Sequence, residues 1–171
     1  MMRTRTTTIH LAVAGVASIC VASAISFAPK LVWNASASAP VGLYRIDESA
    51  LAVGDFVLVS PSEEAAKLIA ERGYLPPDIP LIKRVAAMSG DEICREDSAI
   101  FINKTFVATA QISDSLIRKM PTWSGCFTLH TDEIFLLNDH EKSLDGRYFG
   151  ATSKSDVIGV ARPVWVTEAA R

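Results

Sequence analysis

The stretch PLIKRVAAM (80–88) has the composition of a β-strand, and it places a lysine and an arginine inside an apolar run. Five further stretches share its enrichment in β-branched and aromatic residues: GLYRI (42–46), FVLVS (56–60), AIFINKTFV (99–107), EIFLLN (133–138) and VIGVARPVWV (157–166). Short turn signals such as Gly54-Asp55 and Gly90-Asp91 separate them. Many short strands with few helices predict a mainly β fold, a folded sheet or barrel-like domain.

The sequence predicts one short helix within this β-rich region. Ser60 is expected to cap it and Pro61 to occupy its first position. An apolar stripe follows, and Gly73 is expected to end the helix. The next segment, YLPPDIP (74–80), is expected to be an irregular loop, because its three prolines exclude regular strand pairing.

The N-terminal region predicts a membrane anchor. No Asp, Glu, Lys or Arg occurs between Thr6 and Pro29. The apolar part of this segment, residues 11–28, would rise about 27 Å as a helix, against a bilayer core of about 30 Å. The alternative is a cleaved signal peptide, whose apolar region is shorter, about 7 to 15 residues. The length favours a retained anchor.

The charges around this segment predict an orientation. Arg3 and Arg5 precede it, and the positive-inside rule places them in the cytoplasm and the rest of the chain outside it. We therefore expect a cytoplasmic N-terminus and anchor over residues 1–30 and an extracytoplasmic domain over residues 31–171.

Composition excludes some classes of function. The chain has 171 residues and a net charge of −2, which gives no electrostatic support for nucleic-acid binding. No CxxC or clustered Cys/His spacing occurs, so a structural zinc site is not expected.

Lys83 is the first candidate for chemistry. It and Arg84 point to opposite faces of the predicted strand, because side chains alternate along a strand. An inward lysine loses its charge more easily, and lowering its pKa from about 10.4 to about 7.4 corresponds to about 4 kcal/mol of desolvation. A neutral amine can accept the proton of a serine hydroxyl, as in Ser-Lys catalysis. The alternative is that both residues are edge charges that discourage strand pairing.

Ser38, in NASASAPVGLY (34–44), is the natural partner for Lys83. It lies between the apolar segment and a Pro-Val-Gly turn, which can fix the backbone and expose a small hydroxyl. The alternative is a flexible linker of small residues. The three histidines, at positions 10, 130 and 140, give no convincing triad spacing.

Four motifs in this order resemble the TraF-type conjugative-transfer signal peptidases, a branch of the signal peptidase I superfamily. They are NASASAPVGLY (34–44), similar to the signature Ser-x-Pro-x-Gly-x-Tyr, GDFVLV (54–59), LIKRVAAMSGD (81–91) and FLLNDHEKSLDGRYFG (135–150). The ordered set is more specific than any one motif. The resemblance implies a signal-peptidase-like β domain preceded by one transmembrane helix, and it implies neither a cofactor nor a metal.

The resemblance implies a role for each matched residue. Ser38 matches the nucleophile and Lys83 the general base. Ser36 matches the position whose hydroxyl joins the Ser38 backbone N–H in binding the oxyanion, a contribution commonly worth about 10²–10³ in rate.

The C-terminal motif supplies the supporting residues. Ser143 matches a serine that hydrogen-bonds the lysine, and Asp145 and Arg147 match a pair that braces this segment. The family's usual serine before Arg147 is Gly146 here, so looser local support is expected.

Two cysteines lie well beyond the N-terminal segment. The surrounding sequences GDEIC and WSGCF recur in the family, so the resemblance implies a disulfide between Cys94 and Cys126 outside the cytoplasm. The alternative is two free buried thiols.

The resemblance implies a serine endopeptidase held in the inner membrane by a single pass, with its catalytic domain in the periplasm. Its partners would be the bilayer, a prepilin-like precursor and components of a type IV secretion system. One rival is a general signal peptidase I for secretory precursors. The other is a non-enzymatic, membrane-anchored scaffold of a secretion complex.

Overall fold

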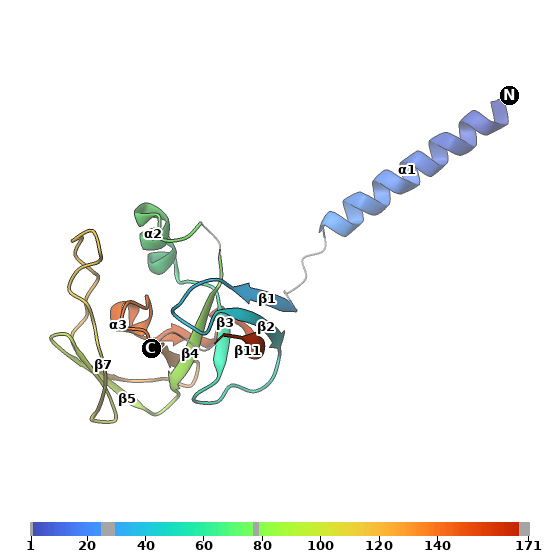
Figure 1. Cartoon of the computed structure of the whole chain (residues 1–171). Coiled ribbons are helices and arrows are strands. Elements are labelled where there is room, and N and C mark those ends of the chain that lie inside the picture. The colour runs from blue at the N-terminus through green and yellow to red at the C-terminus, as the bar shows by residue number, and fades with distance from the viewer. Residues whose placement is uncertain (1, 25–29, 77–78, 168–171) are drawn as a thin grey trace.

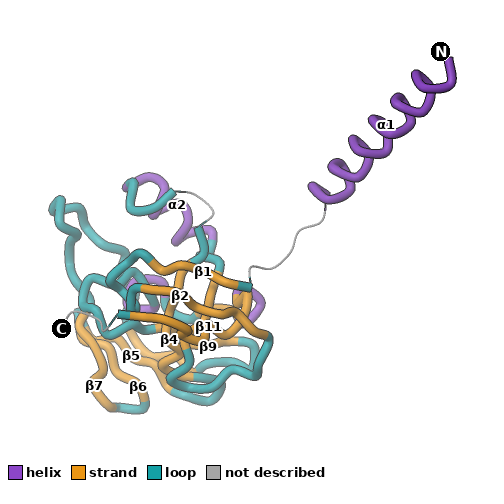
Figure 2. Tube along the Cα trace, turned by 45° about the vertical axis from the view of Figure 1, so that its right-hand side comes forward, coloured by secondary structure: helices purple, strands orange, loops and turns teal. Residues whose placement is uncertain are grey.

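The computed structural model describes residues 2–24, 30–76 and 79–167. Figures 1 and 2 show the strands gathered into one β domain, with the helix α2 at its margin and the N-terminal helix α1 standing apart. The mainly β fold predicted from the strand-forming stretches is confirmed.

The larger sheet supports most of the candidate site. Its seven strands pair antiparallel in the order β1-β2-β11-β3-β4-β9-β10. Their bounds are β1 Leu31–Asn34, β2 Gly42–Asp47, β3 Phe56–Val59, β4 Leu81–Ala87, β9 Glu133–Leu136, β10 Thr152–Ser153 and β11 Val157–Val166. The strand β4 is interior, between β3 and β9, so a side chain on its inner face is removed from water.

A second sheet has four strands in the order β7-β6-β5-β8. Their bounds are β5 Glu92–Glu96, β6 Ala99–Ile102, β7 Thr105–Thr109 and β8 Gly125–Thr128. The stretch 99–107, predicted as one strand, is a hairpin whose turn residues Asn103 and Lys104 have φ of 48° and 67°. Two consecutive positive φ values are those of a type I′ turn, which asparagine tolerates well.

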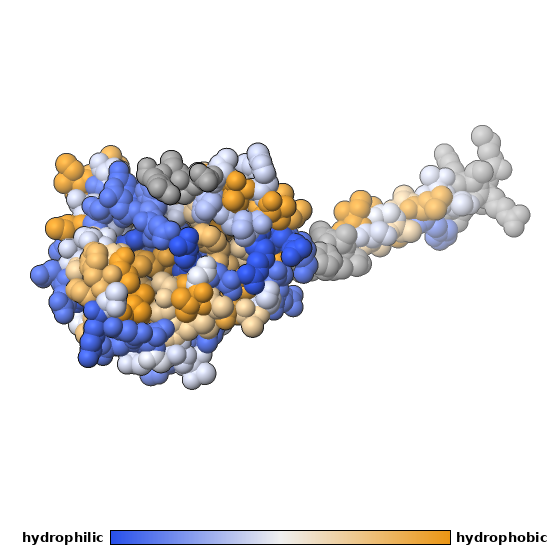
Figure 3. Space-filling model, turned by 60° about the horizontal axis from the view of Figure 1, so that its bottom comes forward, coloured by the Kyte–Doolittle hydropathy of each residue, from blue (hydrophilic) through white to orange (hydrophobic). Residues whose placement is uncertain are grey.

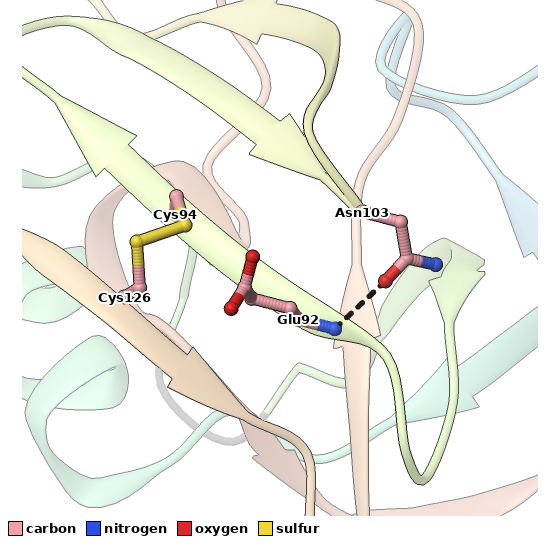
Figure 4. The surroundings of a disulfide bond; sticks show 4 residues. All are labelled: Glu92, Cys94, Asn103 and Cys126. Atoms are coloured by element: carbon pink, nitrogen blue, oxygen red, sulfur yellow. Dashed lines mark hydrogen bonds between the residues drawn. A yellow bond between two sulfur atoms is a disulfide. The ribbon is translucent and has the colours of Figure 1, made fainter.

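The disulfide Cys94–Cys126 joins neighbouring strands of this second sheet. Cys94 on β5 lies directly opposite Cys126 on β8, and their Cα atoms are 4.1 Å apart. Figure 4 shows this bond and, on the same strand, the Glu92 backbone N–H donating to Asn103 Oδ1 over 2.9 Å. The turn of the β6–β7 hairpin is thereby tied to β5.

The helix α2, Glu63–Arg72, begins two residues later than predicted. Its cap is Ser62, whose side chain accepts from the Ala65 N–H over 3.3 Å. The predicted cap, Ser60, instead donates its backbone N–H to Asp156, which continues the sheet. Gly73 ends the helix with a φ of 65°, in the left-handed conformation that the sequence predicted.

The helix α1, Met2–Ala24, covers most of the predicted anchor. Figure 3 shows hydrophobic side chains along it, interleaved with more hydrophilic ones. Among the described residues, no helix combines the length and hydropathy that a bilayer crossing requires. The predicted transmembrane helix is therefore not shown, and the end of its apolar segment, residues 25–28, lies outside the described residues.

A small third helix, α3, Gly146–Phe149, follows the loop that leaves β9. Asp145 caps it by accepting from the Arg147 N–H over 3.2 Å. The first residue of α3, Gly146, lies close to Phe135 and Leu136 of β9.

Candidate active site

A cavity of about 610 Å³ brings together four of the residues singled out from the sequence. Ser36 and Ser38 reach it from the loop after β1, Lys83 from β4, and Ser143 from the loop after β9. Its walls are largely apolar and include Ile69, Leu75, Leu81, Ile82, Met120 and Leu144. The four polar side chains are therefore surrounded mostly by apolar ones.

Lys83 is buried, with 5% of its surface exposed, although it carries an ammonium group in its usual state. Desolvation lowers the pKa of Lys83 from 10.5 to about 8, with Asp145 opposing the shift and Arg147 adding to it. That difference corresponds to about 3 kcal/mol of lost stability while the amine stays protonated. Arg84, its neighbour, lies near the surface and pairs with Asp139 over 2.9 Å. Of the two strand cations, the structure places Lys83 inside.

Ser143 holds the amine of Lys83. The Lys83 Nζ donates to Ser143 Oγ over 3.0 Å, and Ser143 is almost fully buried. The two residues are sixty positions apart, so this contact depends on the way β9 and its loop pack beside β4.

The backbone on either side of Lys83 is clamped by Asn138, a residue that sequence reasoning missed. Its Nδ2 donates to the Ile82 carbonyl over 3.1 Å, and its Oδ1 accepts from the Arg84 N–H over 2.8 Å. Asn138 is 1% exposed and stands where β9 has left the sheet, so its amide replaces the missing strand neighbour.

Asp145 and Arg147 form a buried ion pair behind this clamp. The Arg147 Nη1 lies 2.8 Å from Asp145 Oδ2, and Arg147 Nη2 donates to the Asn138 carbonyl over 2.7 Å. Asp145 also accepts from the Asn138 N–H over 3.1 Å. Burial raises the pKa of the Asp145 carboxyl, and the Arg147 and Lys83 charges oppose that change. The pair thus holds Asn138, and Asn138 holds the strand that carries Lys83.

Ser36 and Ser38 also line the cavity. Ser36 Oγ and Ser38 Oγ are 3.0 Å apart, and Ser38 is half-buried. Among the hydrogen bonds of the described residues, none joins Ser38 to Lys83. The two side chains line one cavity, and each is hydrogen-bonded to another serine, Ser38 to Ser36 and Lys83 to Ser143.

Asp114 organises the far wall of the cavity and was also missed from the sequence. It accepts from the Arg118 Nε over 2.7 Å and pairs with Arg72, at the end of α2, over 3.4 Å. The hydroxyl of Tyr74 also donates to it. Burial acts to raise the pKa of the Asp114 carboxyl, but the hydrogen bonds from Tyr74 and Arg118 hold it well below its usual range. The loop 111–120 is thereby fixed to α2. No signal in the sequence links these two segments.

The packing around Gly146 differs from the looser support that the sequence predicted. A Cβ built there would lie 2.6 Å from the Phe135 ring and 2.9 Å from the Leu136 carbonyl, so the space of the family's usual serine is filled. Trp123 Nε1 donates to the Gly146 carbonyl over 3.1 Å, and Arg95 donates to the carbonyl of Arg147. The support at this position is tight, contrary to the looser packing expected.

We therefore expect Gly146→Ser to destabilise the protein even though it restores the family's usual residue. The added side chain must displace the Phe135 ring or shift the backbone of β9, at a cost of about 1–3 kcal/mol. Thermal unfolding followed by circular dichroism measures the effect. Gly15→Ser in α1 is the comparison, because a Cβ there meets no atom within 4 Å and the backbone at Gly15 is helical. An unchanged melting temperature in Gly146→Ser would show that Phe135 yields freely.

We expect Lys83→Met to be more stable than the wild type at pH 7 by about 1–3 kcal/mol, because it removes a buried ammonium. The pKa of Lys83 is lower in the folded chain than in the unfolded one, so the wild type gains stability as pH rises from about 8 toward 10.5. The advantage of the variant should shrink over that range. Urea unfolding at pH 7, 8.5 and 10 checks the trend, and a variant that is less stable at every pH would contradict it.

Comparison with known proteins agrees with the four sequence motifs. The family described as "Signal peptidase, peptidase S26" matches residues 3–166. A plasmid transfer protein TraF of Escherichia coli is 34% identical over 96% of this chain and 98% of its own length. A conjugal transfer protein TraF of Agrobacterium tumefaciens (strain 15955) is 33% identical over 77% of this chain and 80% of its own length.

Among solved structures, a signal peptidase I from Enterococcus faecalis V583 aligns with a TM-score of 0.40 and 17% identity, over 67% of this chain and 98% of its own. The resemblance to TraF-type signal peptidases predicted from the motifs is confirmed by the sequence matches. The chain belongs to the signal peptidase S26 family, a family of peptidases, and is similar to TraF proteins along nearly its whole length.

Proposed function

We propose that this protein is a serine endopeptidase with Ser38 as nucleophile and Lys83 as general base. The observation that carries the proposal is the buried Lys83 amine, with a pKa lowered to about 8, in the same apolar-walled cavity as Ser38. A lysine with a pKa of about 8 is partly neutral at physiological pH, and the neutral fraction can take a proton without a histidine.

The chemistry follows from these positions. Ser38 Oγ attacks the carbonyl carbon of the scissile peptide bond while its proton passes to the neutral amine of Lys83. The Ser36 hydroxyl and the Ser38 backbone N–H donate to the oxyanion that forms. The Lys83 ammonium then protonates the leaving amine, and an acyl-enzyme ester remains on Ser38. Water, or an amine of the substrate itself, resolves the ester with Lys83 again taking the proton.

The substrate we propose is an exported precursor of a conjugation apparatus, such as a pilin precursor of a type IV secretion system. The similarity to plasmid and conjugal transfer proteins TraF supports this class. Hydrolysis and cyclisation are distinguished by mass spectrometry of the processed product, because a cyclic product is 18 Da lighter than the trimmed linear peptide.

We also propose that the N-terminal segment anchors the chain in the inner membrane and that the β domain faces the periplasm. The uncharged sequence between Thr6 and Pro29, preceded by two arginines, supports the anchor and its orientation. The Cys94–Cys126 disulfide supports a location of the β domain on the oxidising side of the membrane, where such bonds persist.

The proposal is tested by precursor processing in membranes that carry the wild type, Ser38→Ala or Lys83→Ala. We expect both variants to lose processing by at least about 10³-fold at equal accumulation, because each removes a reacting group. Ser155→Ala and Lys67→Ala, on exposed residues that do not line the cavity, are the matched controls and should process normally.

Three patterns of result separate the rival functions. Cleavage that survives in both variants overturns the dyad. A wild type that also cleaves unrelated secretory precursors indicates a general signal peptidase. If the wild type cleaves no precursor and Ser38→Ala still supports conjugation, the protein acts as a scaffold.

The lowered pKa of Lys83 predicts the pH dependence of the reaction. Since the base must be neutral, kcat/KM should rise about tenfold per pH unit below pH 8 and level off above about 8. The rate of precursor cleavage between pH 6 and 10 measures this, with the folded state checked at each pH. A rise that begins only near pH 10 would mean that Lys83 keeps its charge, and a flat profile would mean that another group is the base.

A further inference from the structure

Asn34, the last residue of β1, lies under the loop that carries Ser36 and Ser38 and is 8% exposed. Its side-chain amide makes five hydrogen bonds, all within residues 36–40. The Nδ2 donates to the carbonyls of Ser36 over 2.9 Å, Ala39 over 3.0 Å and Pro40 over 3.0 Å. The Oδ1 accepts from both the backbone N–H and the hydroxyl of Ser36, each over 3.1 Å. One buried amide therefore shapes the whole loop.

These contacts fix which way the amide of Asn34 points. A flipped amide would set its oxygen against three carbonyl oxygens and its NH₂ group against the Ser36 N–H. The Oδ1 must therefore face Ser36. An amide oxygen accepts and cannot donate, so the Ser36 hydroxyl gives its single proton to Asn34.

The direction of the hydrogen bond between Ser36 and Ser38 follows from this assignment. Ser36 Oγ lies 3.0 Å from Ser38 Oγ, and with its proton committed to Asn34 it offers Ser38 a lone pair. Ser38 is then the donor. In the free chain the proton of Ser38 points to Ser36, and the amine of Lys83 is held by Ser143.

We propose that Asn34 is a positioning residue that sets the place of the Ser38 oxygen and the direction of the Ser38–Ser36–Asn34 hydrogen-bond chain; this rests on the proposed function of Ser38. When a substrate carbonyl enters, the Ser36 hydroxyl turns from Asn34 to the oxyanion and the Ser38 proton turns to Lys83. The three carbonyl contacts of Asn34 keep the loop backbone in place during that exchange, so the donors stay aimed.

The test compares cleavage of the precursor by the full-length wild type, Asn34→Ala, Ser36→Ala and the double variant. We expect Asn34→Ala to lower kcat by about 10- to 100-fold and to change KM by less than about threefold, because the loop moves relative to the bound peptide. The losses of the two single variants should not multiply in the double variant, since Asn34 acts partly through the Ser36 hydroxyl.

Asn103→Ala is the matched control. Asn103 also uses its side-chain amide to hold a turn, accepting from the Glu92 N–H and donating to Asp91, but it lies in the second sheet. It should leave kcat unchanged. A kcat that equals the wild-type value in folded Asn34→Ala, or losses that multiply fully with those of Ser36→Ala, would overturn the role of Asn34. If Ser38→Ala still cleaves the precursor, the proposed function of Ser38 as nucleophile fails as well. If Ser38→Ala is inactive while Asn34→Ala keeps the wild-type kcat, only the role of Asn34 fails.

Asn34→Asp provides a second readout that does not require deleting the side chain. It keeps the acceptor for Ser36 but turns an oxygen toward three carbonyls, so it should also lower kcat at neutral pH. The introduced carboxylic acid can donate to one of those carbonyls when protonated. The kcat of this variant relative to the wild type should therefore rise as pH falls, and a ratio that stays at one at every pH would contradict the proposal.

Discussion

The burial of the Lys83 ammonium is the constraint on which the rest of the site depends. A cation removed from water on an interior strand costs stability, about 3 kcal/mol for the lowered pKa of about 8. The cost is smaller when the amine is neutral, which is the state that accepts a proton. The burial that costs stability is therefore the same burial that makes the amine able to accept a proton, and the surrounding structure must hold Lys83 away from water.

That holding structure is a continuous polar network behind the cavity. Ser143 binds the amine, Asn138 binds the backbone on both sides of the lysine, and the Asp145–Arg147 pair binds Asn138. All of these groups are buried, so leaving any one unpaired would be costly. The network reaches the second sheet where Arg95 donates to the Arg147 carbonyl. The two sheets are thus joined at the point that supports the base.

Two asparagines have the same role, Asn34 beside the loop of Ser36 and Ser38 and Asn138 beside Lys83. Asn34 stands at the end of β1 and Asn138 just beyond the end of β9, where regular pairing stops. An amide offers both donors and an acceptor, so it can satisfy a backbone that has left the sheet. The backbone that has left the sheet near Ser38 and Lys83 is thereby held by side-chain amides.

The sequence by itself determined the mainly β fold, the positions of most strands and the end of α2 at Gly73. It also singled out Ser38 and Lys83, which line one cavity. These features are local: they depend on periodicity, β-branched residues, turn glycines and the order of short motifs. Local patterns also placed the α2 cap at Ser60 instead of Ser62, because composition does not show which serine hydroxyl accepts from a helix N–H. They predicted β6 and β7 as one strand, because composition does not show where the chain turns to form a hairpin.

Only the tertiary structure decided that Lys83 rather than Arg84 is buried, that Asn34 and Asn138 clamp the two halves of the site, and that Phe135 fills the space a serine at position 146 would need. The reason is physical. Desolvation, hydrogen-bond partners and free volume belong to residues that are far apart in the chain and meet only when the sheets close. Asn138 and Ile82, separated by fifty-six positions, carry no mark of their contact in the sequence between them.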